Sequence, residues 1–485
     1  MKRIVYTILV SLISFLLISC GTTKTSTTTT SKKIDPRYTG MGAGFEKMDL
    51  SKIEMPETFV DDMIEAEDFG SRLSYKLVAH SNENGLFVDG VIIYFPTGIV
   101  QNPNIEFSYI VSGRKQYEIK DIYACSYDLK KTTSETNYLY ISIDPDSKAF
   151  PVINSIHNED SPYNDLKDCY ELKINNEEIE NVGLICPDLF GLVEGECYFE
   201  NTTIRYMAYE NLEEDNMKNP LIIWLHGGGE GGTFPEIAVL GNEVPALFRD
   251  EIQSYFRKNG SSGAYVLVPQ CETMWMDADG NGSLRQSISY GCQSSFYTEY
   301  LMATIMSYVE YNEDVDPTRI YVGGCSNGGY MSLELAFKCP EYFAAIYPIC
   351  PGYKNTNISE EMIESIKHLP IWIVQSIDDI ILNPKIYEEP VYARIIESGN
   401  DNAYYSMYDK VRGTDMKDIN YIGHYAWVYL FNNQVKKVQD KTKIKYDLGE
   451  NKDYGFIGNS EGGTETVSNY DGIWDWMSNQ KKENK

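Results

Sequence analysis

The pattern of hydrophobic and polar positions changes character near residue 185. Before that point, β-branched and aromatic residues gather in short runs separated by turn-forming residues, which is typical of strands. Helical periodicity is scarce in this region. The predicted strands are residues 73–78, 90–95, 105–111, 119–125 and 138–143. We expect residues 56–185 to form a small β-sandwich.

After residue 185, apolar strand-like runs alternate with segments of helical periodicity. This alternation is typical of a parallel sheet whose strands are connected by helices. The predicted strands are residues 221–225, 264–268, 320–322, 343–349, 371–374 and 403–408, and the predicted helices are residues 296–311, 327–338 and 472–479. We expect residues 186–485 to form an α/β domain with a mostly parallel sheet and helices on both faces.

The first twenty residues have a pattern of their own. Lys2 and Arg3 precede an apolar run over residues 4–18. The run is short for a hydrocarbon core of ~30 Å, but it fits the hydrophobic region of a secretory signal peptide. Residues 17–20, LISC, resemble the bacterial lipobox, in which Cys20 would be lipidated and become the new N-terminus. The alternative is a plain signal peptide with an incidental cysteine.

These features predict two parts in the N-terminal segment. Residues 1–19 are expected to be a lipoprotein signal peptide. Residues 20–55 are expected to be the lipidated cysteine and a tether, because the Ser/Thr-rich tract that opens them has too little apolar surface to fold. The predicted location is therefore the bacterial cell envelope, outside the cytoplasm, with the chain bound to a membrane through the lipid on Cys20.

Composition narrows the possible partners. The 485 residues exceed one average domain. Acidic residues outnumber basic ones 71 to 42, and the resulting net charge of −29 argues against a nucleic-acid partner. None of the ten cysteines shows the close C-x-x-C spacing of a zinc or redox site, so no metal is predicted. In an exported protein some cysteines could pair, for example Cys271 with Cys292.

Residues 324–328, GCSNG, match the G-x-S-x-G pattern of a nucleophile elbow. A predicted strand leads into the motif and a predicted helix follows it, as such an elbow requires. The glycines at 324 and 328 fit this interpretation, because side chains there would clash with the neighbouring strand or helix. Ser326 is the predicted nucleophile, and an ordinary turn between strand and helix is the alternative.

A serine nucleophile needs a general base, and the chain has only five histidines. His80 and His157 precede the α/β region. His226 lies in a glycine-rich loop, and His368 precedes a strand at the wrong end of the sheet. His424 follows the last strand predicted before it, so we predict that His424 is the base.

The acid that orients this histidine should follow a strand between Ser326 and His424. Asp378 and Asp379 follow the strand predicted at residues 371–374. Only one of the two adjacent carboxylates can point at the imidazole, and we favour Asp379. The resulting order, Ser326, Asp379, His424, is that of the α/β-hydrolase fold.

The tetrahedral intermediate needs donors for its oxyanion. Residues 226–232, HGGGEGG, directly follow the strand predicted at 221–225, and glycines let backbone N–H groups approach a substrate closely. One donor is predicted to be Gly228 or Gly229, and the other the N–H of Asn327. A phosphate-binding loop is the alternative, but the segment has neither G-K-[ST] nor G-x-G-x-x-G.

Four segments together carry a family resemblance: residues 220–232, 316–329, 370–379 and 423–427. At these residues the chain resembles secreted α/β-hydrolase esterases of the poly(3-hydroxybutyrate)-depolymerase-like and feruloyl-esterase-like group, often labelled prolyl-oligopeptidase-family hydrolases. The resemblance implies an α/β-hydrolase fold and ester hydrolysis without a cofactor or metal. Some of these relatives have an immunoglobulin-like domain before the hydrolase, which suits the β-rich region.

The chain also departs from that family. Relatives often have His-Gly or His-Ala where this chain has Gln375 and Ser376, and Val-Pro where it has Leu382 and Asn383. An acidic residue is still present despite these departures, but they make the choice between Asp378 and Asp379 less certain from the family pattern. They do not identify the acyl group either, since a shared fold is a weak guide to substrate.

Weaker signals concern the pocket. Trp275 and Trp427 are candidate pocket walls, with core packing as the alternative for both. Glu230 is a polar pocket group or a solvated residue. Residues 277–282 mimic the start of an EF-hand loop, but the twelfth position is Ile288 in place of the required Glu, so a solvated loop is favoured.

These predictions combine into an exported serine esterase. Its expected substrate is a small-molecule or polymer-borne ester, such as a feruloyl or acetyl ester of a plant polysaccharide, or a polyester. A serine peptidase of the prolyl-oligopeptidase type is one alternative, although the chain shows no motif for binding a peptide. A binding lipoprotein with an inactive hydrolase body is the other.

Overall fold

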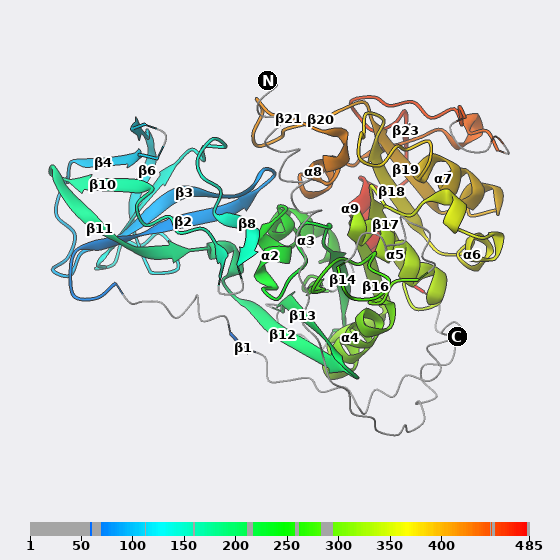
Figure 1. Ribbon diagram of the computed structural model, residues 1–485, viewed down its shortest axis with the longest axis horizontal. Coiled ribbons are helices and arrows are strands. Elements are labelled where there is room, and N and C mark those ends of the chain that lie inside the picture. Colours follow the sequence, from blue (N-terminus) through cyan, green and yellow to red (C-terminus); the bar gives the residue numbers. More distant parts are fainter. Residues whose placement is uncertain are drawn as a thin grey trace. The chain divides into compact units, whose positions relative to one another are not determined.

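The computed structural model shows two compact units (Figure 1). The first comprises residues 59–193 with 239–245, and the second comprises residues 194–238 with 246–485. The predicted signal peptide, Cys20 and the tether lie outside the described residues. No helix in the described part of the chain is long and apolar enough to cross a bilayer. The structure describes residues 59–60, 69–111, 113–158, 161–210, 217–257, 261–282, 294–446, 448 and 452–482.

The first unit is β-rich, as predicted, and is built on one eight-stranded sheet. The strand order is β5 (Lys115–Gln116), β4 (Ile105–Tyr109), β10 (Tyr170–Ile174), β11 (Glu177–Ile185), β2 (Ser74–Asn82), β3 (Gly85–Tyr94), β7 (Tyr138–Ile143) and β6 (Ile119–Cys125). Neighbouring strands are antiparallel except β11 and β2, which are parallel. The unit also contains β1 (Phe59–Val60), β8 (Ile153–Asn158), β9 (Ser161–Tyr163) and the 3-10 turn η4 (Pro187–Leu189).

Aromatic side chains fill the interior of this unit. The Tyr75 hydroxyl on β2 donates a hydrogen bond to the Tyr170 carbonyl on β10 at 3.2 Å. The Tyr75 and Phe107 rings meet edge to face, with centroids 6.4 Å apart, and Phe107 stacks on Tyr170 at 5.4 Å. Because β2 is not a hydrogen-bonded neighbour of β4 or β10, these contacts show that the sheet bends around a shared aromatic core.

The second unit is built on a mostly parallel sheet. Eight of its strands follow the order β12 (Leu192–Phe199), β13 (Thr202–Tyr209), β15 (Tyr265–Gln270), β14 (Asn219–Leu225), β16 (Val315–Cys325), β17 (Ala345–Ile349), β18 (Ile371–Ser376) and β19 (Ala403–Tyr408). β13 pairs antiparallel with β15, and every pair from β15 and β14 to β18 and β19 is parallel. The carboxyl ends of β14, β16, β18 and β19 therefore share one edge of the sheet, where side chains from distant segments can meet.

Helices cover both faces of this sheet, as predicted. On one face, Val322 of β16 belongs to a core that also includes residues of α4 (Thr298–Tyr311), α5 (Asn327–Lys338) and α7 (Glu388–Glu397). On the other face, the ring of Tyr321 contacts Phe256 of α3 (Asp250–Phe256), and Tyr347 of β17 contacts Trp474 of α9 (Ile473–Ser478). The alternation of adjacent residues between the two faces is the strand period of two.

The remaining short elements lie in the connections. They are α2 (Glu236–Leu240), η5 (Val244–Phe248), η8 (Asn355–Asn357), α6 (Glu360–Ser365), β20 (Val411–Arg412), β21 (Asn420–Tyr421), η9 (Gly423–Tyr425), α8 (Trp427–Phe431), β22 (Lys437–Val438), η10 (Lys441–Lys443) and β23 (Glu465–Thr466). Among the cysteines, Cys271 is a fully buried free thiol, so the structure does not show the suggested pairing with Cys292, which lies outside the described residues.

Candidate active site

Ser326 stands in a strained turn between β16 and α5. Its backbone adopts φ 54° and ψ −108°, a left-handed conformation that residues with a side chain rarely adopt. Its N–H donates to the Ile349 carbonyl at 2.9 Å, and its carbonyl accepts from the Tyr330 N–H at 2.9 Å and the Gly352 N–H at 3.0 Å. These hydrogen bonds on both sides of the residue hold the strained conformation.

The glycines around the serine are required by close packing. A Cβ at Gly328 would overlap the carbonyl oxygen of Leu225, and a Cβ at Gly324 would lie 2.8 Å from the Leu225 side chain. The predicted reason for both glycines is therefore confirmed. Between Ile320 and Phe337, every residue except Ser326 is buried, and Ser326 is partly exposed. The turn thus presents the serine while it hides its neighbours.

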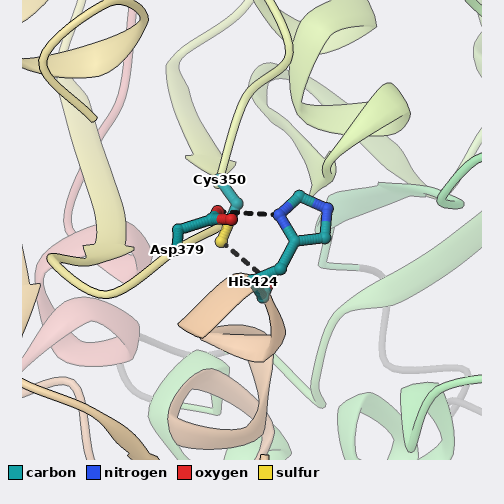
Figure 2. Close-up of side chains that lie close together, drawn as sticks. All are labelled: Cys350, Asp379 and His424. Carbon is teal, nitrogen blue, oxygen red and sulfur yellow. Dashed lines mark hydrogen bonds and ion pairs between the residues drawn. The ribbon is translucent and has the colours of Figure 1, made fainter. Parts of the chain in front are cut away.

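His424 and Asp379 meet in the interior, at the same edge of the sheet (Figure 2). His424 lies in η9, and its Nδ1 is 2.7 Å from Oδ2 of Asp379. The other carboxylate oxygen, Oδ1, accepts the N–H groups of Ile381 at 2.8 Å and Leu382 at 2.9 Å. The side chains of His424 and Asp379 are 5 % and 0 % exposed. A proton on Nδ1 that is held by Asp379 leaves the Nε2 lone pair free to take another proton.

Asp378, the alternative acid, takes another position. It is exposed, and its carboxylate accepts the Ser376 hydroxyl at 2.7 Å. Gly423 allows the His424 segment to approach the turn that contains Asp379, because a Cβ on residue 423 would lie 2.5 Å from the backbone N of Asp379. The structure therefore places Asp379, and not Asp378, beside the imidazole.

Cys350 is a third buried group at this point, and the sequence pattern did not single it out. Its thiol donates to the backbone carbonyl of His424 at 3.1 Å, and burial raises the thiol pKa well above its usual value (Figure 2). Donor atoms of Cys350, Asp379 and His424 lie within 4.8 Å of one another, a set that could hold a metal ion. The hydrogen bonds already account for each of the three, since the thiol keeps its proton and the carboxylate binds the imidazole.

The glycine-rich loop after β14 is organised by its own side chains. His226 is fully buried, and its Nδ1 donates to the Gly227 carbonyl at 2.6 Å while its Nε2 accepts the Cys271 N–H at 3.3 Å. Burial lowers the pKa of His226 to about 4, so the imidazole is neutral near pH 7. Glu230, also buried, accepts the Gly227 N–H at 2.7 Å. Glu230 therefore shapes the loop and is not a solvated residue.

Of the two glycines predicted as oxyanion donors, Gly228 lies close to Asn327. A Cβ on Gly228 would lie 3.9 Å from the Asn327 side chain, and a Cβ on Gly229 would meet no atom within 4 Å. Asn327 is the first residue of α5, so its N–H has no acceptor within the helix. Its side-chain oxygen accepts the Met276 N–H at 3.1 Å, which fixes the start of the helix.

The candidate pocket residues differ from one another. Trp275 is fully buried and packs against the rings of His226 at 5.0 Å and Tyr297 at 6.0 Å, so it belongs to the core and the pocket prediction for it was wrong. Trp427 is 5 % exposed and meets the imidazole of His424 edge to face at 5.7 Å. It is therefore a neighbour of the candidate base.

The segment that mimics an EF-hand is closed by its own hydrogen bonds. One carboxylate oxygen of Asp277 accepts the Thr273 hydroxyl at 2.7 Å and the Gly282 N–H at 2.6 Å. Ile288 lies outside the described residues. The carboxylate that would begin a calcium loop is thus occupied by the turn itself.

Comparison with known proteins agrees with this fold. The phospholipase/carboxylesterase family matches residues 210–422. No curated protein matches the sequence. Among solved structures, a thermostable esterase is 20 % identical and aligns over 74 % of this chain and 96 % of its own, with a TM-score of 0.58.

Two further structures share less of the chain. A ferulic acid esterase of the anaerobic fungus Anaeromyces mucronatus is 15 % identical over 44 % of this chain and 79 % of its own, with a TM-score of 0.32. Est1E of Butyrivibrio proteoclasticus is 14 % identical over 44 % of this chain and 87 % of its own, with a TM-score of 0.29. The family match and the thermostable esterase together show that the second unit has the α/β-hydrolase fold, and the family match supports a hydrolase of the esterase type.

Proposed function

We propose that the protein is a serine esterase that hydrolyses carboxylic esters through an acyl-enzyme. One observation carries this proposal: a strained, accessible Ser326 and a buried His424–Asp379 pair follow parallel strands of one sheet. This is the set of groups that activates a serine hydroxyl. No step requires a metal or an organic cofactor.

The reaction follows from the roles of these groups. Ser326 Oγ forms a bond to the ester carbonyl carbon while Nε2 of His424 takes the hydroxyl proton. The carbonyl oxygen becomes an oxyanion, and the N–H groups of Asn327 and of Gly228 or Gly229 are its proposed donors. The C–O bond to the alcohol then breaks, and His424 gives its proton to the leaving oxygen. Water, deprotonated by the same histidine, releases the acid and restores Ser326.

The proposal also covers the ester substrate, the cellular location and the nature of the β-rich unit. The four segments that resemble feruloyl-esterase-like and depolymerase-like enzymes favour feruloyl or acetyl esters of plant polysaccharides, or a polyester. The lipobox at Cys20 favours export and a lipid anchor at the bacterial cell envelope. The β-rich unit is proposed to be the immunoglobulin-like domain that some of these relatives have.

The test is turnover of 4-nitrophenyl acetate, methyl ferulate and a 4-nitroanilide amide by the full chain and by Ser326→Ala. We expect hydrolysis of the esters, loss of that hydrolysis in the variant, and little amide turnover. A fluorophosphonate should label the wild type and not the variant. Faster cleavage of the amide than of the esters would favour a peptidase. A wild type that hydrolyses none of the three and is not labelled would overturn the proposal in favour of a binding protein.

A further inference from the structure

Residues 350–353, which follow β17, contact the backbone of both the candidate nucleophile and the candidate base; we call them the bridging segment. The Cys350 thiol donates to the carbonyl of His424 at 3.1 Å (Figure 2). Two residues later, the Gly352 N–H donates to the carbonyl of Ser326 at 3.0 Å. Since Ser326 and His424 belong to turns that are far apart in the sequence, the bridging segment links the position of one to that of the other.

Tyr353 ends the bridging segment and anchors it to α5. Its hydroxyl donates to Oε2 of Glu334 at 2.9 Å, and its ring packs against that of Tyr330, with centroids 4.7 Å apart. Both partners lie on α5, which begins directly after Ser326, and the Tyr330 N–H donates to the Ser326 carbonyl at 2.9 Å. The Ser326 carbonyl therefore accepts from the helix and from the bridging segment, and the Tyr353–Glu334 hydrogen bond holds these two supports together.

Glu334 is a buried carboxyl group that the proposed reaction does not use. Both Glu334 and Tyr330 are fully buried, and Tyr353 is 2 % exposed. Burial raises the pKa of Glu334 above its usual value. Among the described residues, its other oxygen, Oε1, has no hydrogen-bond partner. A buried carboxyl group that is only half satisfied costs free energy that an apolar side chain would not. Stability alone therefore does not explain Glu334.

We propose that Glu334 is a positioning residue for Ser326 and His424, which acts through Tyr353 and the bridging segment. The inference rests on the proposed esterase function. Proton transfer from Ser326 to His424 requires the two side chains at a fixed separation, and a displacement of about 1 Å can lower the rate by about 100-fold. In this role Glu334 exchanges no proton and touches no substrate. It keeps the bridging segment on α5, and with it the hydrogen bonds to both backbones.

The test compares Tyr353→Phe and Glu334→Leu with Tyr392→Phe in the full chain. The first two changes each remove the Tyr353–Glu334 hydrogen bond, so we expect kcat on 4-nitrophenyl acetate to fall by about 10- to 100-fold with KM little changed. Labelling by a fluorophosphonate should slow in parallel, because it needs the same activated serine. Tyr392→Phe removes another buried tyrosine hydroxyl, which donates from α7 to the Ala403 carbonyl at 3.1 Å, and it should keep kcat close to wild type.

A conservative variant tests whether the hydrogen bond itself matters. Glu334→Gln keeps an oxygen that can accept the Tyr353 hydroxyl, and it resembles the uncharged acid that burial favours. We therefore expect it to retain most of the wild-type kcat and labelling rate. A loss in Glu334→Gln as large as that in Glu334→Leu would overturn the inference, because an intact acceptor would then make no difference.

The other outcomes separate this inference from the proposed function. Wild-type kcat and labelling rates in Tyr353→Phe and Glu334→Leu would overturn the inference and leave the esterase intact. An equal loss in Tyr392→Phe would also overturn it, because weakened packing in general would then explain the effect. A wild type that neither turns over esters nor is labelled would refute the esterase function first. Circular dichroism and the thermal midpoint check the fold of each variant, and Tyr353→Phe decides the test if Glu334→Leu does not fold.

Discussion

Each unit of this protein holds a histidine that faces an aspartate at hydrogen-bond distance. In the β-rich unit, Nδ1 of His80 lies 2.8 Å from Asp89. In the α/β unit, Nδ1 of His424 lies 2.7 Å from Asp379. The side chains of the first pair are 31 % and 26 % exposed, whereas those of the second are 5 % and 0 % exposed. The same contact therefore occurs in two very different environments.

The two pairs also differ in how the chain assembles them. His80 and Asp89 belong to the hairpin of β2 and β3, where Asp89 is the extra residue of a bulge. His424 and Asp379 come from separate loops after parallel strands, at the sheet edge where the Ser326 turn emerges. A His–Asp contact can thus also form between two neighbouring strands of a hairpin. Burial, and a strained serine at the same edge of the sheet, distinguish the second pair and are the reason we propose it for catalysis.

The largest expected effect comes from removing the two histidines in turn. His424→Asn should lower kcat on 4-nitrophenyl acetate by about 10⁶-fold, because Ser326 loses its base. His80→Asn, the matched change in the exposed pair, should leave kcat close to wild type. Steady-state kinetics on both purified variants measures this. Comparable losses in the two variants would mean that the burial difference does not separate their roles.

The aspartates give the next effect. Asp379→Asn should lower kcat by about 10⁴-fold, because the amide favours the wrong imidazole tautomer and cannot stabilise the imidazolium. Asp89→Asn and Asp378→Asn are the controls, the first in the other unit and the second one residue away. Neither should change kcat appreciably. A larger loss in Asp378→Asn than in Asp379→Asn would reverse the assignment of the acid.

The third prediction concerns the turn between β16 and α5, which carries Ser326 and has no counterpart beside the His80–Asp89 pair. Gly328→Ala forces a Cβ into the Leu225 carbonyl, and the atoms that it meets are all backbone atoms, which cannot turn aside as a side chain can. We expect a loss of about 4 kcal/mol or more in the free energy of unfolding, the range of severe backbone and packing clashes. Gly229→Ala, where a Cβ meets no atom within 4 Å, is the control. Urea unfolding of both variants gives the comparison, and similar stabilities would contradict it.

The elements of the two units could not be predicted equally well from the sequence. In the α/β unit, local chemistry is strong: the strand and helix that flank GCSNG, the few histidines and the glycine loop lead to Ser326 and His424, and the helix predicted at 327–338 coincides with α5. In the β-rich unit, β11 was missed because glutamates at 177, 178 and 180 break its apolar pattern. β11 is a strand because its backbone pairs with β10 on one side and β2 on the other, although its side chains do not show a strand pattern.

Other features depend on contacts between distant segments, which a linear pattern does not contain. Asp378 and Asp379 are adjacent in sequence, and only the approach of Gly423 and the turn of Ile381 shows which one faces inward. Trp275 could have lined a pocket as easily as the core. Cys350 gave no signal, since a lone cysteine at the end of a strand is ordinary until the loop that carries His424 is placed beside it.

The smallest expected effect concerns a third histidine and shows what burial without an aspartate does. His226 is fully buried, and its pKa is lowered from 6.5 to about 4. Between these values the unfolded chain binds a proton that the folded chain does not, so stability is lost as the pH falls from 6.5 toward 4. The loss attributable to this residue is about 3 kcal/mol. His226→Asn does not titrate, so its deficit relative to wild type should shrink by that amount between pH 7 and pH 4, measured by urea unfolding at each pH. A deficit that stays constant with pH would mean that His226 is not held neutral by the fold.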